Sequence, residues 1–213
     1  MTCSNILVTG FEAFGGETLN SSALILKALS APPNSHLSTA TLPVEFERCT
    51  EVLTDLIETL QPDVVLCLGQ AGGRRGISLE RVAINLDDAR ICDNAGIQRV
   101  DVPVCADGPN AYFTSLPIKR MLAALHIANI PADISSSAGG YVCNHLMYGL
   151  LHFLNERPEV RGGFIHVPFL PEQGKRLAAP SMRLETMVEA VSLCLRVCVE
   201  YERDVSYAVG GTH

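Results

Sequence analysis

Three segments of the sequence place a reactive or ionisable side chain where an expected strand gives way to a turn or a helix. Cys143 stands at the expected start of an apolar helix, after a small-residue stretch with two glycines. His166 closes a short apolar strand, and Glu80 lies in an alternating segment that follows a glycine-rich loop. Because open α/β sheets place their sites at the carboxyl ends of strands, these residues are candidates for one site.

Cys143 is the candidate nucleophile because of its expected position at a helix N-terminus. The unpaired amides and the dipole of such a terminus favour the thiolate, and the same amides can hold an oxyanion. A lone cysteine is nevertheless more often a small buried hydrophobic residue. The remaining cysteines fall within a strand, within helices, at the terminus or in loops, without an obvious activating dipole: Cys3, Cys49, Cys67, Cys92, Cys105, Cys194 and Cys198.

His166 and Glu80 would complete the chemistry of a cysteine nucleophile. An imidazole can take the thiol proton and return it to a leaving amine near neutral pH, although a lone histidine can equally be a hydrogen-bonded core residue. Glu80 shares its parity with Val82 and Ile84, so a carboxylate is expected on an otherwise apolar strand face, where it needs a partner. Orienting His166 would supply that partner, and an ion pair with a structural arginine would do so equally well.

Other site chemistries are less well supported by the spacing. His145 and His152 are about two helical turns apart, too far to share one zinc ion with Cys143 without further ligands. Cys194 and Cys198 share a helix face without accompanying ligands, which is typical of core residues. The glycine-rich loop after residue 68 lacks the Gly-Lys-Ser/Thr ending of a phosphate loop. These patterns therefore do not predict a metal or nucleotide site.

The elements that must position these residues are those of an α/β sandwich. Short apolar runs of strand character near residues 6–8, 64–68 and 164–167 alternate with segments of helical period. Helices are expected near 20–29, 46–60, 116–129, 143–156 and 181–203. The stretch 86–117 follows neither period and is rich in Asp, Asn, Gly and Pro, so we expect long loops there with room for one hairpin. The tail 208–213 is expected to fray.

Composition narrows the class of protein. The 213 residues, 47% hydrophobic and 18% charged, are expected to form one globular domain over 1–213. A net charge of -7 without a basic run argues against nucleic acid or an anionic membrane surface as a partner. No export signal and no stretch of roughly 18 apolar residues is recognisable, so we expect a cytoplasmic protein that does not enter a membrane. Its eight cysteines are expected to be reduced thiols.

Several motifs resemble those of the pyrrolidone-carboxylate peptidases (pyroglutamyl peptidase I), and the similarity runs from Gly10 to Gln173. In the family's order they are Gly10-Phe-Glu-Ala-Phe-Gly-Gly, Glu80-Arg-Val-Ala-Ile-Asn, Asp88-Ala-Arg-Ile-Cys-Asp-Asn, Asp107-Gly-Pro, Leu116-Pro-Ile-Lys, Val142-Cys-Asn-His, Gly163-Phe-Ile-His and Leu170-Pro-Glu-Gln. The sequence departs from the family's usual pattern at Ala13, Cys92, Ser136, Ser137, Gly140 and Tyr141. None of these departures removes a catalytic group.

The resemblance implies a cysteine-type omega peptidase, a hydrolase that cleaves the bond after an N-terminal pyroglutamyl residue through a thioester. It implies Cys143 as nucleophile, His166 as acid and base, and Glu80 as the orienting carboxylate, the residues already selected by position. It further implies a three-layer α/β/α sandwich around a twisted mixed sheet, no metal or cofactor, and a homodimer or homotetramer.

The substrate constrains the pocket that should accompany this chemistry. A pyroglutamyl ring is an uncharged lactam, so its pocket should be apolar with a few hydrogen bonds. Phe11 and Phe14 flank the turn after the first strand and are candidate walls, although a phenylalanine is more often a core residue. Arg90 is a candidate oxyanion donor beside the helix amides, and equally a structural ion-pair partner. The other candidate substrate residues are Gln70, Tyr141 and Val142.

Two other functions are compatible with these patterns. A phosphorolytic enzyme on a similar α/β architecture would hold phosphate with the glycine-rich turn and nearby arginines, and its turnover would depend on phosphate. A non-catalytic protein that binds a small ligand could keep the fold without the reaction. The intact set of cysteine, histidine and carboxylate argues against the second alternative.

Overall fold

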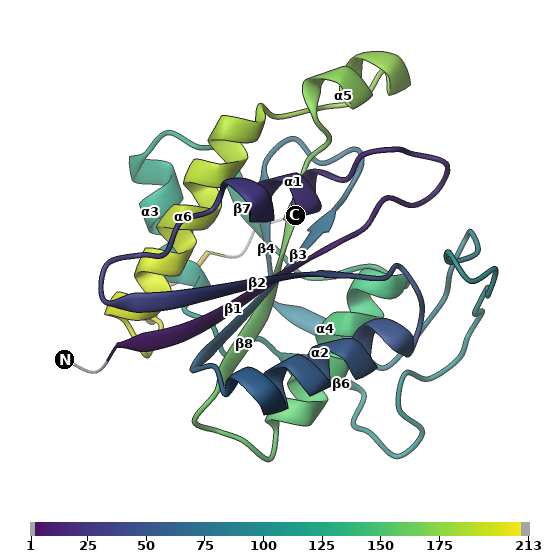
Figure 1. The fold of residues 1–213 in the computed structure, drawn as a ribbon, viewed down its shortest axis with the longest axis horizontal. Helices are drawn as coiled ribbons and strands as arrows, with labels where there is room; N and C mark the ends of the chain where they lie inside the picture. Colours follow the sequence, from purple (N-terminus) through teal and green to yellow (C-terminus); the bar gives the residue numbers. More distant parts are fainter. Residues whose placement is uncertain (1–2, 210–213) are drawn as a thin grey trace.

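The structure, a computed structural model, describes residues 3–209. Its main sheet has six strands in the order β2-β1-β3-β8-β4-β7 (Figure 1). Neighbouring strands run parallel except β4 and β8, which are antiparallel, so the sheet is mixed. The strands are β1 (Ser4–Phe11), β2 (Ser35–Leu42), β3 (Val64–Gln70), β4 (Ile77–Glu80), β7 (Ala132–Ser135) and β8 (Arg161–Val167).

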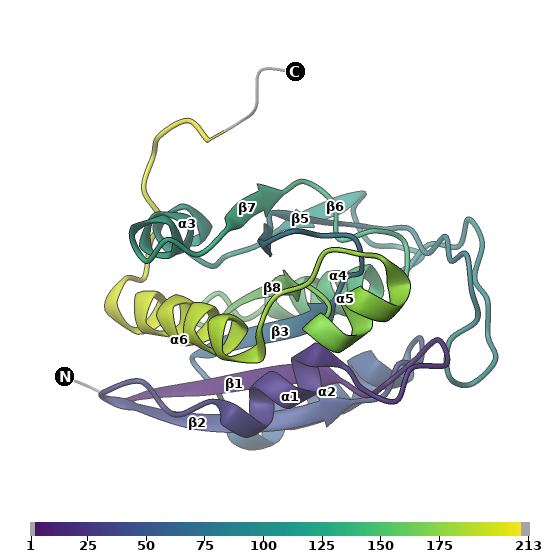
Figure 2. The same ribbon diagram turned by 90° about the horizontal axis from the view of Figure 1, so that it is seen from above.

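Helices cover both faces of the sheet and make three layers (Figures 1 and 2). One face carries α1 (Ser21–Ala28), α3 (Ile118–Ile127) and α6 (Leu184–Glu200), and the other carries α2 (Arg48–Leu60) and α4 (Val142–Leu154). A sixth helix, α5 (Pro171–Leu177), follows β8. The predicted α/β/α sandwich with a twisted mixed sheet is confirmed.

The two cores of this sandwich meet at β3, which is buried along its whole length. Val64, Leu66 and Leu68 pack toward α1, α3 and α6, while Val65 and Cys67 pack toward α2 and α4. Alternate residues of a strand face opposite sides, so an uninterrupted apolar run suits a strand that is covered on both faces. Each fully buried leucine here contributes about 1.5–3 kcal/mol, which makes β3 a rigid base for whatever follows its carboxyl end.

The five predicted helices are present, each ending within a few residues of its expected bounds. Two elements escaped prediction. The edge strand β2 reads Ser-His-Leu-Ser-Thr-Ala-Thr-Leu and lacks the apolar run of a central strand. The helix α5 is only seven residues long, too short to establish a helical period.

The expected strand around Glu80 is interrupted, which corrects the parity argument made from the sequence. The chain leaves the main sheet at Arg81, and β5 (Val82–Ile84) pairs with β6 (Ala111–Phe113) in a separate two-stranded sheet. Glu80 is fully buried, while Val82 and Ile84 are half-buried on this second sheet. Glu80 is therefore buried because it belongs to β4, which lies between β8 and β7 in the main sheet. It does not share a strand face with Val82 and Ile84, which belong to β5.

Most of the stretch 86–117 is loop as predicted, since residues 86–110 contain no helix or named strand, but β6 lies within it at Ala111–Phe113 and pairs with β5 outside it. Hydrogen bonds replace regular structure: Asp87 and Val102 form an isolated antiparallel bridge, and the Asn85 side chain donates to the carbonyls of Cys105 and Gly108. The loop extends away from the sandwich (Figure 2). Residues 210–213 of the tail expected to fray lie outside the described residues.

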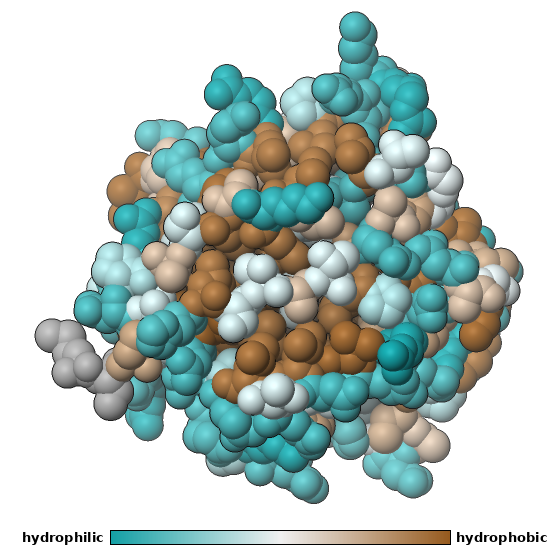
Figure 3. All heavy atoms as spheres, viewed as in Figure 1, coloured by the Kyte–Doolittle hydropathy of each residue, from teal (hydrophilic) through white to brown (hydrophobic). Residues whose placement is uncertain are grey.

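The distribution of apolar side chains on the surface and the state of the cysteines complete the description of the fold. Apolar side chains gather in the middle of one face, where Figure 1 places β1 and β2, with hydrophilic residues around them (Figure 3). All eight cysteines are free thiols. Within residues 3–209, the helices are too short or too polar for a membrane crossing.

Candidate active site

Cys143 is the second residue of α4 and lies at a helix start that is open to a ligand. The side chain of the preceding residue, Tyr141, does not cap the helix, and within residues 3–209 the amides of Val142, Cys143 and Asn144 find no acceptor. The Asn144 side chain fixes the helix instead, because it accepts from the Ile84 amide and donates to the Ile84 carbonyl. The predicted arrangement of a thiol beside free helix amides is therefore present.

His166 and Glu80 meet across the antiparallel pair β8 and β4. The His166 Nδ1 donates to Glu80 Oε1 at 2.7 Å, with both side chains almost fully buried. Because a carboxylate only accepts, the proton of the neutral imidazole lies on Nδ1 and the lone pair on Nε2. The pair therefore has the geometry of an oriented general base.

Both the Cys143 sulfur and His166 are neighbours of Gly69. Gly69 is the residue of β3 that pairs with His166 of β8, and a β-carbon built on Gly69 would lie 2.8 Å from Cys143 Sγ. The same β-carbon would lie 2.7 Å from the Phe164 ring. Phe164 and His166 are on one face of β8, and their rings pack at a tilt with centroids 4.8 Å apart. The structure thus brings Cys143, His166 and Glu80 to one place, although within residues 3–209 the sulfur makes no hydrogen bond to the imidazole.

Arg74 also belongs to this cluster, and sequence reasoning did not give it this role. Its Nη1 lies 3.0 Å from Glu80 Oε1, the oxygen that also accepts from His166, and its Nη2 donates to the Ser137 carbonyl at 3.2 Å. Both partners considered for Glu80, the histidine and an arginine, are therefore present together. The other oxygen, Oε2, is buried and has no hydrogen-bond partner within the described chain. The sequence signal for Arg74 was its place within the glycine-rich loop.

Burial works against ionisation of the nucleophile. It raises the pKa of the Cys143 thiol, the charges of Cys49 and Glu80 act in the same direction, and the Arg74 guanidinium opposes them. Burial therefore opposes the free amides and dipole of the helix N-terminus, which favour the thiolate. A base must take the proton when the reaction starts, which is a role that His166 Nε2 is free to perform.

Five of the six predicted substrate residues border one small pocket beside Cys143. Phe11, Phe14, Gln70, Tyr141 and Val142 line it together with Asn20 and Val44, and its free volume is about 10 Å³. Arg90 does not line it, and its side chain is exposed on the long loop. The position of Arg90 therefore does not support its predicted oxyanion role. Cys143, at the start of α4 where the amides are free, does line the pocket.

Gln70 contributes an unused donor to this pocket. Its Oε1 accepts from the Ser21 amide at 2.9 Å, which fixes the orientation of the side-chain amide. Its Nε2 is buried and has no hydrogen-bond partner within the described residues. A buried donor without an acceptor costs about 1–3 kcal/mol, so a ligand carbonyl at this point would be favourable.

Tyr141 forms one wall and connects the pocket to the long loop. Its hydroxyl donates to the Cys92 carbonyl at 3.0 Å, so two of the departures from the family pattern contact each other. Burial raises the pKa of Tyr141 to about 12, which keeps the phenol protonated as a donor. Its ring lies 6.0 Å from that of Phe14 and packs edge-on against Phe46.

The histidines of α4 have partners other than a shared metal ion. His145 Nδ1 donates to Asp87 Oδ2 at 2.8 Å, and its Nε2 accepts from the Glu47 amide at 3.0 Å. His152 contacts Tyr112 and Cys105. Within residues 3–209, no three His, Cys, Asp or Glu side chains gather as metal ligands would.

Comparison with known proteins agrees with this geometry over nearly the whole chain. The family model described as pyroglutamyl peptidase matches residues 4–201. A pyrrolidone-carboxylate peptidase of Enterobacter sp. (strain 638) is 50% identical over 212 residues, which cover 98% of this chain and 99% of that protein. One of Brevibacillus brevis is 48% identical over 204 residues and covers 94% and 95% of the two chains.

Solved structures give the same answer. Pyroglutamyl peptidase I from Bacillus amyloliquefaciens superimposes with a TM-score of 0.95 at 42% identity, covering 98% of this chain and 100% of that one. A mutant pyrrolidone carboxyl peptidase from Pyrococcus furiosus superimposes with a TM-score of 0.89 at 42% identity, covering 92% and 98%. Identity at this level over nearly full length leaves no alternative family, and the chain belongs to the pyroglutamyl peptidases.

Proposed function

We propose that this protein is a thiol peptidase that removes an N-terminal pyroglutamyl residue from peptides, with Cys143, His166 and Glu80 as its catalytic residues. The observation that carries the proposal is the buried hydrogen bond from His166 to Glu80, on the sheet face covered by α4, whose second residue is Cys143. The family match supports the same activity.

The reaction proceeds through a thioester. Nε2 of His166 takes the thiol proton, and the Cys143 sulfur attacks the carbonyl carbon that joins pyroglutamate to the next residue. Negative charge develops on the carbonyl oxygen, which the free amides at the start of α4 can stabilise. The imidazolium then donates its proton to the leaving amine, and water, activated by the same imidazole, hydrolyses the thioester.

Glu80 and Arg74 hold the base in the required state. The carboxylate keeps the Nδ1 tautomer of His166 and stabilises the imidazolium that forms when the thiol loses its proton. Arg74 keeps this buried carboxylate from being an unpaired charge, at a contact of 3.0 Å. Arg74 is thus a positioning residue that acts through Glu80.

The pocket suits an uncharged ring. Its walls are largely apolar, no acidic side chain among residues 3–209 borders it, and Gln70 Nε2 can donate to the lactam carbonyl. The α-ammonium of an N-terminal glutamate would find no counter-charge there. With only about 10 Å³ free, the pocket must widen to admit a lactam ring.

The proposed enzyme uses no metal or cofactor, acts in the cytoplasm, and assembles into a homodimer or homotetramer. Free thiols throughout the chain support a reducing compartment. Exposed apolar side chains on the long loop, at Ile91, Ile97, Val100 and Val102, support a protein contact there. A phosphorolytic reaction is less well supported, because Arg74 is already engaged by Glu80 and the Ser137 carbonyl.

The assay that tests the proposal uses a fluorogenic pyroglutamyl amide. We expect turnover without added phosphate or metal, complete loss after iodoacetamide, and no turnover by Cys143→Ala. Cys194→Ala is the matched control, because Cys194 is fully buried in α6 and far from the chemistry. Turnover that requires phosphate, or that survives in Cys143→Ala, would refute the proposal.

A further inference from the structure

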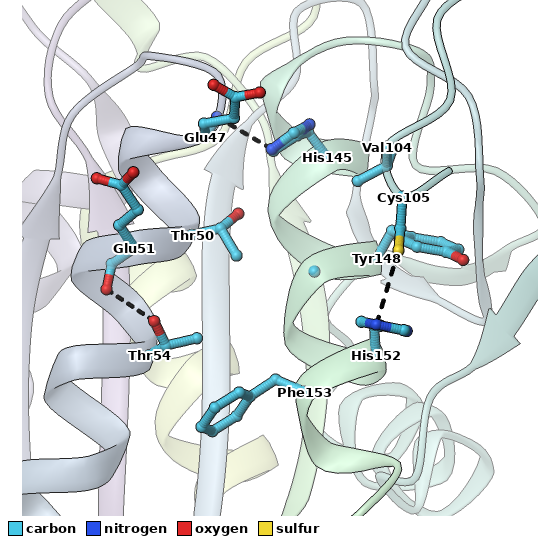
Figure 4. A pocket seen from close by; sticks show the side chains of 11 residues that line it. Glu47, Thr50, Glu51, Thr54, Val104, Cys105, His145, Tyr148, His152 and Phe153 are labelled. Carbon is cyan, nitrogen blue, oxygen red and sulfur yellow. Dashed lines mark hydrogen bonds between the residues drawn. The ribbon is translucent and has the colours of Figure 1, made fainter. Parts of the chain in front are cut away.

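A second cysteine and histidine pair borders a cavity of about 390 Å³ between α2 and α4 (Figure 4). Figure 4 shows Cys105 and His152 pointing toward each other at one side of this cavity. Cys105 Sγ lies 3.7 Å from His152 Nε2, a hydrogen bond for sulfur. The proposed catalytic residues do not line this cavity, which is separate from the pocket beside Cys143.

The cysteine and histidine of this second pair, and a tyrosine that contacts the histidine, come from three separate elements. Cys105 comes from the long loop, His152 from the last turn of α4, and Tyr112 from β6. The Tyr112 hydroxyl and His152 Nδ1 lie 2.8 Å apart. With the hydrogen on Nδ1 donated to the phenol oxygen, the Nε2 lone pair faces the Cys105 thiol. In that tautomer the two residues and Tyr112 have the same order of nucleophile, base and orienting group as that proposed for Cys143, His166 and Glu80.

The position of the pair leaves it open to a ligand. His152 lies in the last turn of α4, beside the cavity. Burial raises the pKa of Tyr112, so its hydroxyl stays protonated. Cys105 is half-buried, which leaves its sulfur within reach of a small molecule.

The rest of the cavity indicates what that molecule is. Apolar surface is supplied by Val104, Tyr148 and Phe153, which suits a short hydrocarbon chain. Two carboxylates, Glu47 and Glu51, border the cavity on the α2 side (Figure 4), and their charge disfavours binding of an anionic ligand. A small, neutral, partly apolar electrophile fits these conditions.

We propose that Cys105 is a covalent modification site for small apolar α,β-unsaturated carbonyl compounds. His152 Nε2 takes the thiol proton, and the sulfur forms a bond to the β-carbon of the electrophile. The electron pair of the carbon–carbon double bond moves to give an enolate, and the imidazolium returns the proton to the α-carbon. The product is a saturated thioether carbonyl with His152 neutral again, so no leaving group or oxidant is needed.

Cys92 provides an internal control for the test. It is exposed on the same loop, and within residues 3–209 its sulfur has no hydrogen-bond partner. The intact protein is exposed briefly to trans-2-hexenal, the adducts are fixed by reduction with borohydride, and the rate at each cysteine is measured by peptide mass spectrometry. We expect Cys105 to react at least about tenfold faster than Cys92, since a positioned base contributes such factors or more.

Two comparisons separate the contributions of the base and of the cavity. His152→Gln should bring the Cys105 rate down to within about twofold of the Cys92 rate. Replacing hexenal with acrolein, which lacks the apolar chain, should reduce the preference for Cys105. Equal rates at Cys105 and Cys92 in the intact protein would overturn the proposal without any variant, and an unchanged Cys105 rate in His152→Gln would overturn the role of the histidine. Pyroglutamyl hydrolysis enters none of these measurements, so their outcome is independent of the proposed function.

Discussion

Gly69 lies so close to Cys143 that a β-carbon on Gly69 would come within 2.8 Å of the sulfur. The central strand β3 therefore presents bare backbone to the sulfur of the proposed nucleophile at the point where β3 pairs with His166. No larger residue leaves room for the sulfur between β3 and the start of α4. The contact makes the position of the thiol depend on a glycine that carries no chemistry of its own.

Gly69→Ala should accordingly disable the enzyme by displacing the sulfur. A shift of about 1 Å at a reacting atom can cost roughly 100-fold in rate, so we expect kcat/KM to fall by about that factor or more. Crowding against Phe164 should lower the free energy of unfolding by about 1–3 kcal/mol, which leaves a folded protein. Kinetics with a pyroglutamyl amide and denaturant unfolding measure the two effects. A folded Gly69→Ala with nearly normal kcat/KM would show that the sulfur is not held as described.

Arg74→Ala tests whether the arginine acts through Glu80. We expect kcat to fall by about tenfold with KM little changed, because the arginine supports the carboxylate and does not line the substrate pocket. Arg74→Lys keeps the charge and should recover part of the rate. The neighbouring Arg75, exposed and without an ion pair in the described structure, is the matched control. An effect confined to KM would instead place Arg74 in substrate binding.

Specificity for the closed ring should depend on the aromatic walls. A peptide with N-terminal glutamate should be cleaved orders of magnitude more slowly than its pyroglutamyl counterpart, because burying an unpaired ammonium costs several kcal/mol. Phe14→Ala should narrow this gap mainly by weakening the cyclic substrate. The control is Phe113→Ala, since the Phe113 ring is 70% exposed and outside the pocket. Comparable kcat/KM for both peptides on the unmodified protein would contradict the lactam pocket.

Buried thiols should make the fold sensitive to alkaline pH. Burial raises the pKa of Cys49, Cys67 and Cys198 to about 12 each, whereas the unfolded chain ionises its thiols near about 8.5. Between these values the unfolded state binds fewer protons than the folded state. Stability is therefore fully present below about pH 8.5 and is lost as pH rises toward 12, by up to about 1.4 kcal/mol per pH unit for each thiol.

Urea unfolding at a series of pH values measures this loss. The free energy of unfolding should fall from about pH 8.5 upward, and Cys198→Ala should show a shallower slope because one titrating thiol is gone. A free energy that stays constant up to about pH 10.5 would mean that these thiols ionise equally in both states.

The sequence was sufficient for features that depend on local pattern. The apolar run of β3 and the helical period of α4 identified elements at whose ends the candidate site lies. Position selected Cys143, His166 and Glu80 as candidates, and the family motifs implied the same three residues. These residues could be found because strand ends and helix starts of one sheet converge in space.

What the sequence could not provide were contacts between segments without a shared period. Arg74 reaches Glu80 and the Ser137 carbonyl from a loop whose path follows only from the assembled sheet. The change of sheet at Arg81 depends on hydrogen bonds from Arg81 to Ser135 and from Thr114 to Arg81. Cys105 and His152 are 47 residues apart and meet only because the long loop folds back over α4.

The central claim is that Cys143 carries the acyl group during hydrolysis, and trapping that intermediate tests it most directly. The enzyme is mixed with a pyroglutamyl amide, quenched in acid within the first turnover, digested, and examined by mass spectrometry. We predict a pyroglutamyl thioester on the peptide that contains Cys143 and its absence when water has had time to hydrolyse it. An acyl group on another residue, or turnover in Cys143→Ala, would contradict the account.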